Sequence, residues 1–131
     1  MKKQNFRLYR VILPVTDIET AVAFYSGVLK NEGMRVSPGR HYFNLGGTIL
    51  ACYDPRSDGD PGDDDWKFHE NQYLYIATND LTKTLESISA FGGEVTSEIE
   101  QMPWGETLFY AKDPFNNPIC FVEESSIFLG E

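Results

Sequence analysis

Two stretches that share one pattern decide the fold of this chain: Arg10-Val-Ile-Leu-Pro-Val-Thr-Asp17 and Tyr73-Leu-Tyr-Ile-Ala-Thr-Asn-Asp80. In each stretch a short apolar run, typical of a β-strand, leads to an aspartate that can cap a helix. Apolar residues at helical spacing follow both aspartates. An internal repeat of this kind predicts two copies of one structural unit.

Each copy continues with the same expected order of strand, helix, strand, strand, strand. In the first copy, a helix between the strand at 6–15 and the Asn31-Glu-Gly33 stop precedes strands at 34–37, 41–45 and 48–53. In the second, a helix between the strand at 72–78 and Gly92-Gly93 precedes strands at 94–99, 107–111 and 118–123. One such unit leaves a sheet face bare, so two must combine to bury their apolar surface.

The fold predicted for residues 1–131 is therefore a single α+β domain with two βαβββ modules. Module one spans about 6–54, a linker spans 55–70, and module two spans about 71–124. Curved sheets should form a trough between the modules, with the helices on the outside. The stretch 54–65 is rich in aspartate and glycine, but its spacing matches no calcium-binding loop with a closing glutamate. We expect a solvated linker there.

Composition excludes several classes of partner. The net charge is −9, and phosphate binding needs a basic surface, so we expect neither nucleic acid nor an anionic membrane as partner. No apolar run approaches the roughly 20 residues of a membrane span. The basic start leads into an alternating pattern, so no signal peptide is expected. Two cysteines make no disulfide framework, which favours reduced thiols and a cytoplasmic location.

The paired βαβββ order resembles the vicinal-oxygen-chelate superfamily, which includes glyoxalase I, extradiol dioxygenases and bleomycin-resistance proteins. The resemblance extends from about Phe6 to Glu124. It depends most on Trp104-Gly105 and on Phe109-Tyr-Ala-Lys-Asp-Pro-Phe-Asn-Asn-Pro-Ile-Cys-Phe-Val-Glu123, which is similar to the last hairpin of the family. Asn116 stands where the family turn usually has glycine, and asparagine also tolerates positive φ. The chain is most similar to the metal-free bleomycin-resistance type.

The resemblance implies where a metal would be held. Metal-using members commonly have His or Gln at the start of the first strand of each module and a Glu on the last strand. Here those positions are Arg10, Tyr73, Cys120 and a residue near Leu50. Arginine and leucine offer no lone pair, and a catalytic metal needs about three protein ligands. We therefore expect no cofactor; a divalent metal held by Tyr73, Cys120 and Glu124 is disfavoured. His41 and His69 are interpreted as surface or capping residues.

Strand periodicity predicts the lining of the trough. Alternate residues share a face, so Arg10 and Ile12 should line it from the first strand. Tyr73, Tyr75 and Cys120 should line it from module two. An apolar wall with few polar groups is typical of a small-molecule pocket, although the same side chains could simply fill the hollow as a second core. The candidate ligand-binding residues are Arg10, Ile12, Tyr73, Tyr75, Trp104, Tyr110, Cys120 and Glu124.

Two of these residues allow alternative roles. Arg10 could clamp a ligand carboxylate or phosphate, or be neutralised by Glu124 or Glu106. Cys120 could be a nucleophile, but no histidine is placed to form its thiolate, which favours an inert buried thiol.

The function expected from these observations is binding or sequestration of a small organic ligand, antibiotic-like or aromatic, by a homodimer without metal. The alternative is a metal-dependent lyase or dioxygenase of glyoxalase type with a displaced metal site. A third class is a purely structural or regulatory dimer, whose trough would be plugged by its own side chains.

Overall fold

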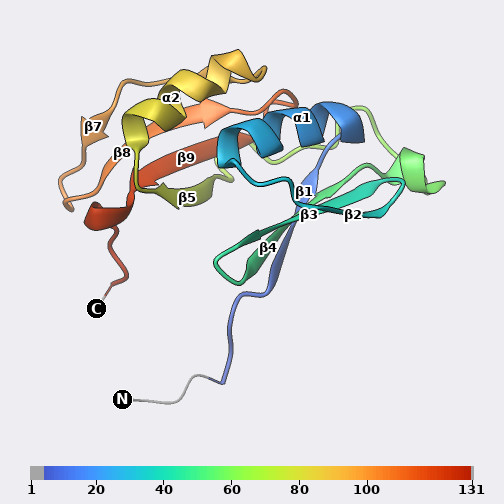
Figure 1. The fold of residues 1–131 in the computed structure, drawn as a ribbon, viewed down its shortest axis with the longest axis horizontal. Coiled ribbons are helices and arrows are strands. Elements are labelled where there is room, and N and C mark those ends of the chain that lie inside the picture. Colours follow the sequence, from blue (N-terminus) through green and yellow to red (C-terminus); the bar gives the residue numbers. More distant parts are fainter. Residues whose placement is uncertain (1–4, 131) are drawn as a thin grey trace.

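The computed structural model describes residues 5–130, and it contains the two predicted modules (Figure 1). Module one consists of β1 (Arg10–Pro14), α1 (Ile18–Leu29), β2 (Met34–Ser37), β3 (Arg40–Leu45) and β4 (Thr48–Tyr53). Module two consists of β5 (Leu74–Thr78), α2 (Leu81–Ala90), β6 (Glu94–Val95), β7 (Glu100–Gln101), β8 (Thr107–Lys112) and β9 (Pro118–Glu123). Short 3-10 turns, η1 (Pro55–Asp58) and η2 (Glu124–Ser126), follow β4 and β9. The repeat and the α+β class are confirmed.

Each module builds its own sheet. Sheet A has the strand order β1-β4-β3-β2, and sheet B has the order β5-β9-β8-β6, with β7 also paired to β8. The first strand of each module lies parallel to the last one, with Ile12 opposite Ala51 and Tyr75 opposite Cys120. Both helices lie on the same side of the two sheets and contact each other (Figure 1). The other side of each sheet therefore has no helix over it.

The repeated aspartates cap the helices as predicted. Asp17 accepts hydrogen bonds from the backbone N–H groups of Glu19 and Thr20, at 3.1 and 3.2 Å. Asp80 accepts one from Lys83 N at 3.1 Å. These side chains satisfy N–H groups that the first helical turn leaves without a partner. The family-like turn after β8 also has the expected geometry, because Asn116 has a φ of 66°.

Several strand boundaries differ from the prediction by one or two residues, and two strands differ by more. β1 begins at Arg10 and not at residue 6, although Tyr9 O still accepts a hydrogen bond from Ile49 N at 2.8 Å. The strand expected over 94–99 is divided into β6 and β7. The reason is local: the Ser97 hydroxyl accepts the N–H of Tyr110 at 2.9 Å, in place of a backbone carbonyl. The ladder is therefore interrupted between the two short strands.

Most of the 54–65 stretch is exposed, as expected for a solvated linker, but its first residues contact module one. Residues 55–58 form η1, and Asp54 is buried. The Asp58 carboxylate accepts hydrogen bonds from Ser37 Oγ at 2.8 Å and from Gly39 N at 2.6 Å, and it forms an ion pair with Arg40. The start of the linker thus holds the β2–β3 turn in place, because the Asp58 carboxylate accepts hydrogen bonds from donors of that turn.

One apolar core runs through both modules, and a buried polar cluster crosses it. Tyr25 of α1 donates to the Asp113 carboxylate of the β8–β9 turn at 2.7 Å. Asn117 Nδ2 donates to Pro14 O at 2.8 Å and to Asp113 at 2.9 Å, while Asn117 Oδ1 accepts Phe68 N–H at 2.7 Å. Asn117 is fully buried. The turn of module two is thereby fixed to β1 and α1 of module one.

Candidate ligand-binding faces

The helix-free side of sheet B carries a group of tyrosines around one thiol. Register places Tyr75 opposite Cys120, which in turn lies opposite Tyr110. The Tyr73 ring centroid lies 5.2 Å from that of Tyr110 and 6.4 Å from that of Tyr75. Leu108, Val122 and Met102 pack beside Cys120 and Tyr110. We call Tyr73, Tyr75, Tyr110 and Cys120 the tyrosine face.

The tyrosine face is open on its outer side and uncharged. Tyr73 and Tyr75 are 39% and 57% exposed, whereas Cys120 beneath them is fully buried. Desolvation and the neighbouring Tyr110 hydroxyl raise the pKa of Tyr75 to about 12. Desolvation, followed by the charge of Glu106, raises the pKa of Cys120 to about 12. Neutral hydroxyls here can donate and accept hydrogen bonds, and the neutral thiol is no nucleophile at pH 7.

The raised pKa of Cys120 predicts a loss of stability at high pH. The unfolded thiol ionises near pH 9 but the folded one only near pH 12, so the unfolded state releases more protons between these values and stability falls as pH rises. From pH 7.5 to 10.5 the free energy of unfolding should lose about 2 kcal/mol through this thiol, at 1.36 kcal/mol per pH unit. Urea denaturation of wild type and Cys120→Ala at both pH values measures it; equal losses would contradict it.

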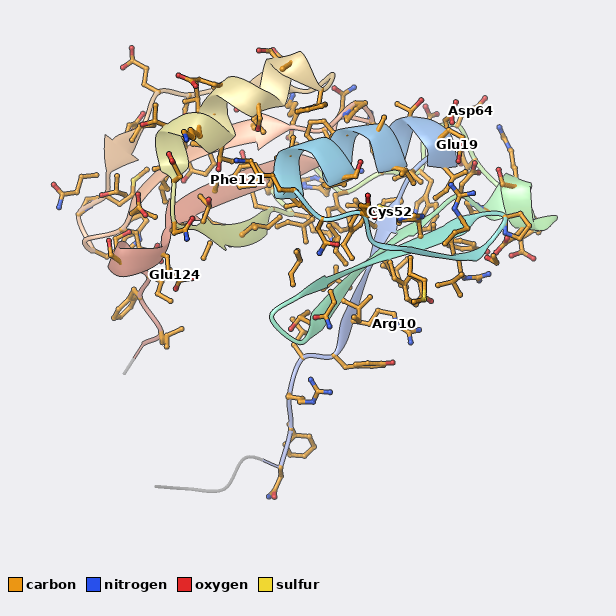
Figure 2. The ribbon with its side chains drawn as sticks, viewed as in Figure 1. Arg10, Glu19, Cys52, Asp64, Phe121 and Glu124 are labelled. Atoms are coloured by element: carbon orange, nitrogen blue, oxygen red, sulfur yellow. The ribbon has the colours of Figure 1, made fainter. Side chains whose placement is uncertain are left out.

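The helix-free side of sheet A carries Arg10, Ile12, Tyr42, Ile49 and Ala51, which we call the arginine face. Register places Ile12, Ala51 and Tyr42 in one row across β1, β4 and β3. Arg10 lies far from both helices (Figure 2). These residues are the module-one counterparts of the tyrosine face.

The guanidinium of Arg10 contacts aromatic rings. Its carbon Cζ lies 4.9 Å from the Tyr9 ring centroid and 5.1 Å from that of Tyr42, and Nη2 donates to Tyr9 Oη at 3.1 Å. Neither Glu106 nor Glu124 forms an ion pair with Arg10. Glu106 instead accepts hydrogen bonds from Trp104 Nε1 at 2.7 Å and from Phe128 N at 3.1 Å.

The eight residues predicted for the site are therefore distributed over four places. Four of them come together as the tyrosine face, and Arg10 and Ile12 lie on the other sheet. Trp104 is exposed on the turn between β7 and β8. Glu124 begins η2 and lines a cleft between the modules.

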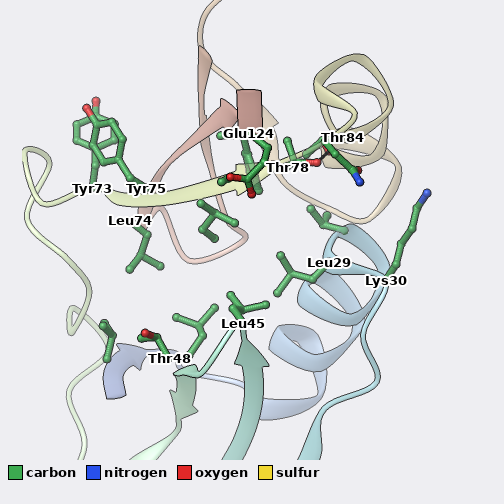
Figure 3. Close-up of a pocket in the computed structure, with 18 of the residues that line it drawn as sticks. Leu29, Lys30, Leu45, Thr48, Tyr73, Leu74, Tyr75, Thr78, Thr84 and Glu124 are labelled. Atoms are coloured by element: carbon green, nitrogen blue, oxygen red, sulfur yellow. Dashed lines mark hydrogen bonds between the residues drawn. The ribbon is translucent and has the colours of Figure 1, made fainter. Parts of the chain in front are cut away.

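A cleft of about 850 Å³ lies between the modules (Figure 3), and three of the predicted site residues, Tyr73, Tyr75 and Glu124, are among those that line it. Leu29, Leu45 and Leu74 point into the cleft, whereas Tyr73 and Tyr75 line its edge with their rings turned to the other side of β5. Its walls are apolar, and its polar lining residues include Lys30, Asp80, Lys83 and Glu124. Strand alternation does not predict the space around Leu74, because only the packing of one module against the other opens it.

The donor set of the two open faces does not fit a divalent metal. Register makes Ala51 the counterpart of Cys120, one residue from Leu50, near which the position was expected; Leu50 itself faces the core. Neither Ala51 nor Leu50 has a side-chain atom that could bind a metal ion. Within residues 5–130 no group of three or more His, Cys, Asp or Glu side chains is placed to hold a metal ion.

Both histidines form hydrogen bonds away from the two open faces. His41 is buried, contrary to the interpretation as a surface residue, with Nδ1 accepting from Arg35 Nε at 3.2 Å and Nε2 2.9 Å from Glu32 O. His69 is exposed, and its Nδ1 accepts Asn71 N–H at 3.1 Å within a turn, in line with a capping role.

The fold defines the class of this protein: it has two βαβββ modules, each with one sheet face that no helix covers. The chain belongs to the Glyoxalase/Bleomycin resistance protein/Dioxygenase superfamily, whose family model matches residues 7–121. None of the helices within residues 5–130 is long and apolar enough to cross a membrane.

Individual relatives are distant. A probable lactoylglutathione lyase of Vibrio parahaemolyticus is 24% identical over 96% of both chains. A glyoxalase-related enzyme from Fulvimarina pelagi has a TM-score of 0.73 at 17% identity, covering 91% of this chain and 88% of its own. Lactoylglutathione lyase from Agrobacterium tumefaciens has a TM-score of 0.69 at 19% identity, covering 93% and 96%. At these identities the solved structures establish the shared fold.

Proposed function

We propose that this protein binds and sequesters a small organic ligand, aromatic or antibiotic-like, without a metal ion. The observation that carries the proposal is the tyrosine face: three neighbouring tyrosine rings, of which those of Tyr73 and Tyr75 are exposed, above a buried thiol. Aromatic walls with a few polar groups are the usual lining of small-molecule sites. The exposure of Tyr73 and Tyr75 argues against a chain that plugs this surface with its own side chains.

A homodimer would enclose the ligand. The tyrosine face and the arginine face lie on different sheets of one chain, and β1 and β5 are edge strands without a partner on one side. Edge strands and exposed apolar residues favour association with a second chain. Phe6, Leu8 and Phe128 supply further exposed apolar surface near the two ends of the described chain. We propose that the tyrosine face of one copy meets the arginine face of the other.

We also propose a cytoplasmic location, because the two cysteines are unpaired and buried. The second candidate function is a metal-dependent lyase of glyoxalase type. It is favoured by the name of the Vibrio relative, a probable lactoylglutathione lyase. That function would require ligands other than those on the two open faces.

A thermal-shift screen with two buffer conditions tests the proposed function against this alternative. Aromatic carboxylates, cationic antibiotics and thiol conjugates would be added in one series in EDTA and in a second, chelator-free series containing Mn²⁺, Ni²⁺ or Zn²⁺. Ligands of one class should raise the melting temperature equally with and without metal, because binding to the native state stabilises it. A shift seen only with a divalent ion, or near-stoichiometric metal in untagged protein, would support the lyase instead.

A further inference from the structure

Arg10 differs from the other arginines of the sheet and linker in having no acidic partner. Arg35, Arg40 and Arg56 pair with Glu19, Asp58 and Asp64, respectively. Arg10 forms no ion pair with any carboxylate of residues 5–130, in a chain with 20 acidic residues and a net charge of −9. A guanidinium carries five N–H donors in a fixed planar fork. The described residues accept one hydrogen bond from it, at Tyr9 Oη.

The guanidinium is nevertheless held in place. Two rings, those of Tyr9 and Tyr42, lie within about 5 Å of it, at 4.9 and 5.1 Å. Cation–π contacts of this kind attract the charge without using its N–H donors. The hydrogen bond to Tyr9 raises the pKa of Arg10 further, so the side chain is charged throughout the physiological range. Its donors are therefore oriented before any ligand arrives, which reduces the entropy lost on binding.

The surroundings of Arg10 are apolar and partly cationic. Ile12, Tyr42, Ile49 and Ala51 form the surface beside it. Arg7 Cζ lies 5.8 Å from the centroid of the same Tyr9 ring, and Arg7 Nη1 donates to Gly47 O at 3.1 Å. A second guanidinium nearby adds positive potential where the rest of the protein is acidic. A cationic ligand would meet repulsion at this point, and an anion would meet attraction.

From these contacts we infer that the ligand is a planar aromatic anion, whose carboxylate or similar group binds Arg10 while its ring packs on Tyr42 and Ile12. This inference rests on the proposed function and specifies its ligand class. It decides between the two roles that the sequence leaves open for Arg10. The planar fork of arginine matches a carboxylate in a two-bond geometry that lysine cannot reproduce.

Three probes with one ring system and different charge test the inference: 2-naphthoate, 2-naphthamide and 2-naphthylmethylammonium. Calorimetric titration of the full chain should give an affinity for the carboxylate roughly tenfold or more above that for the amide, because a hydrogen bond to a charged group is stronger than a neutral one. The ammonium probe should bind most weakly. Arg10→Gln should reduce the difference between carboxylate and amide to less than about twofold.

Arg56→Gln is the matched control. It removes the same charge from an exposed arginine of the linker that pairs with Asp64, and the carboxylate preference should persist. Both variants should keep the wild-type melting temperature, since both side chains are exposed. Equal affinities for amide and carboxylate, or tightest binding of the ammonium probe, would overturn the inference and leave the proposed function standing. Absence of binding by all three probes would overturn both.

Discussion

Replacing Asn117 with alanine is expected to lower the free energy of unfolding by roughly 3–5 kcal/mol. The side chain is fully buried, and its amide joins Phe68 N, Pro14 O and the Asp113 carboxylate. Alanine would remove the side-chain partner of Phe68 N–H and of Pro14 O, and each such buried group costs about 1–3 kcal/mol when it is left unsatisfied. Asp113 would lose one donor but keep Tyr25 Oη. Because the cluster connects the two modules, the unfolding transition should also lose cooperativity.

Asn116→Gly supplies the matched control one residue away. Asn116 has a φ of 66°, a conformation that glycine adopts without strain, so this variant should be as stable as the wild type or slightly more stable. Urea denaturation followed by circular dichroism and by tyrosine and tryptophan fluorescence gives both values. An Asn117→Ala variant within 1 kcal/mol of the wild type would mean that the cluster does not hold the modules together.

Replacing Tyr73 with alanine is expected to lower the affinity for 2-naphthoate at least tenfold. Tyr73 contacts both Tyr75 and Tyr110, so its loss removes one stacking surface and releases the other two rings. Tyr73→Phe keeps the ring and should retain most of the affinity. Calorimetric titration of the three proteins separates the contribution of the ring from that of the hydroxyl.

Unchanged affinity in Tyr73→Ala would place the ligand elsewhere, and the cleft between the modules is the alternative location. Leu45→Asp tests that location, because Leu45 points into the cleft and lies away from the tyrosine face (Figure 3). A loss of affinity in Leu45→Asp together with a normal Tyr73→Ala would reject the tyrosine face as the binding surface.

Most of the fold could be predicted from the sequence because its signals are local and occur twice. Asp17 and Asp80 mark both helix starts, and alternation in the adjoining strands assigns inward and outward residues. What could not be predicted depends on long-range side-chain contacts. Ser97 interrupts a strand by accepting the Tyr110 N–H. Asp58, at the start of the exposed linker, accepts a hydrogen bond from the β2–β3 turn.

In the candidate site, too, local patterns could be predicted and long-range contacts could not. Strand parity was enough to group Tyr73, Tyr75 and Cys120, since residues two apart share a face and register aligns neighbouring strands. Parity could not reveal that Arg10 is held by Tyr9 and Tyr42 and not by Glu106. It also could not reveal the cleft, whose walls come from helix ends, a hairpin and a linker residue, Phe68, that meet only in three dimensions.

A crystal structure of the full chain with 2-naphthoate, grown without a chelator, tests the central claim most directly. We expect a homodimer with the naphthalene ring between Tyr73 and Tyr75 of one copy and Tyr42 and Ile12 of the other. The carboxylate should lie on Arg10 of that second copy, with no ion between them. A divalent ion held by side chains of this chain between β1 and β5 would contradict the account.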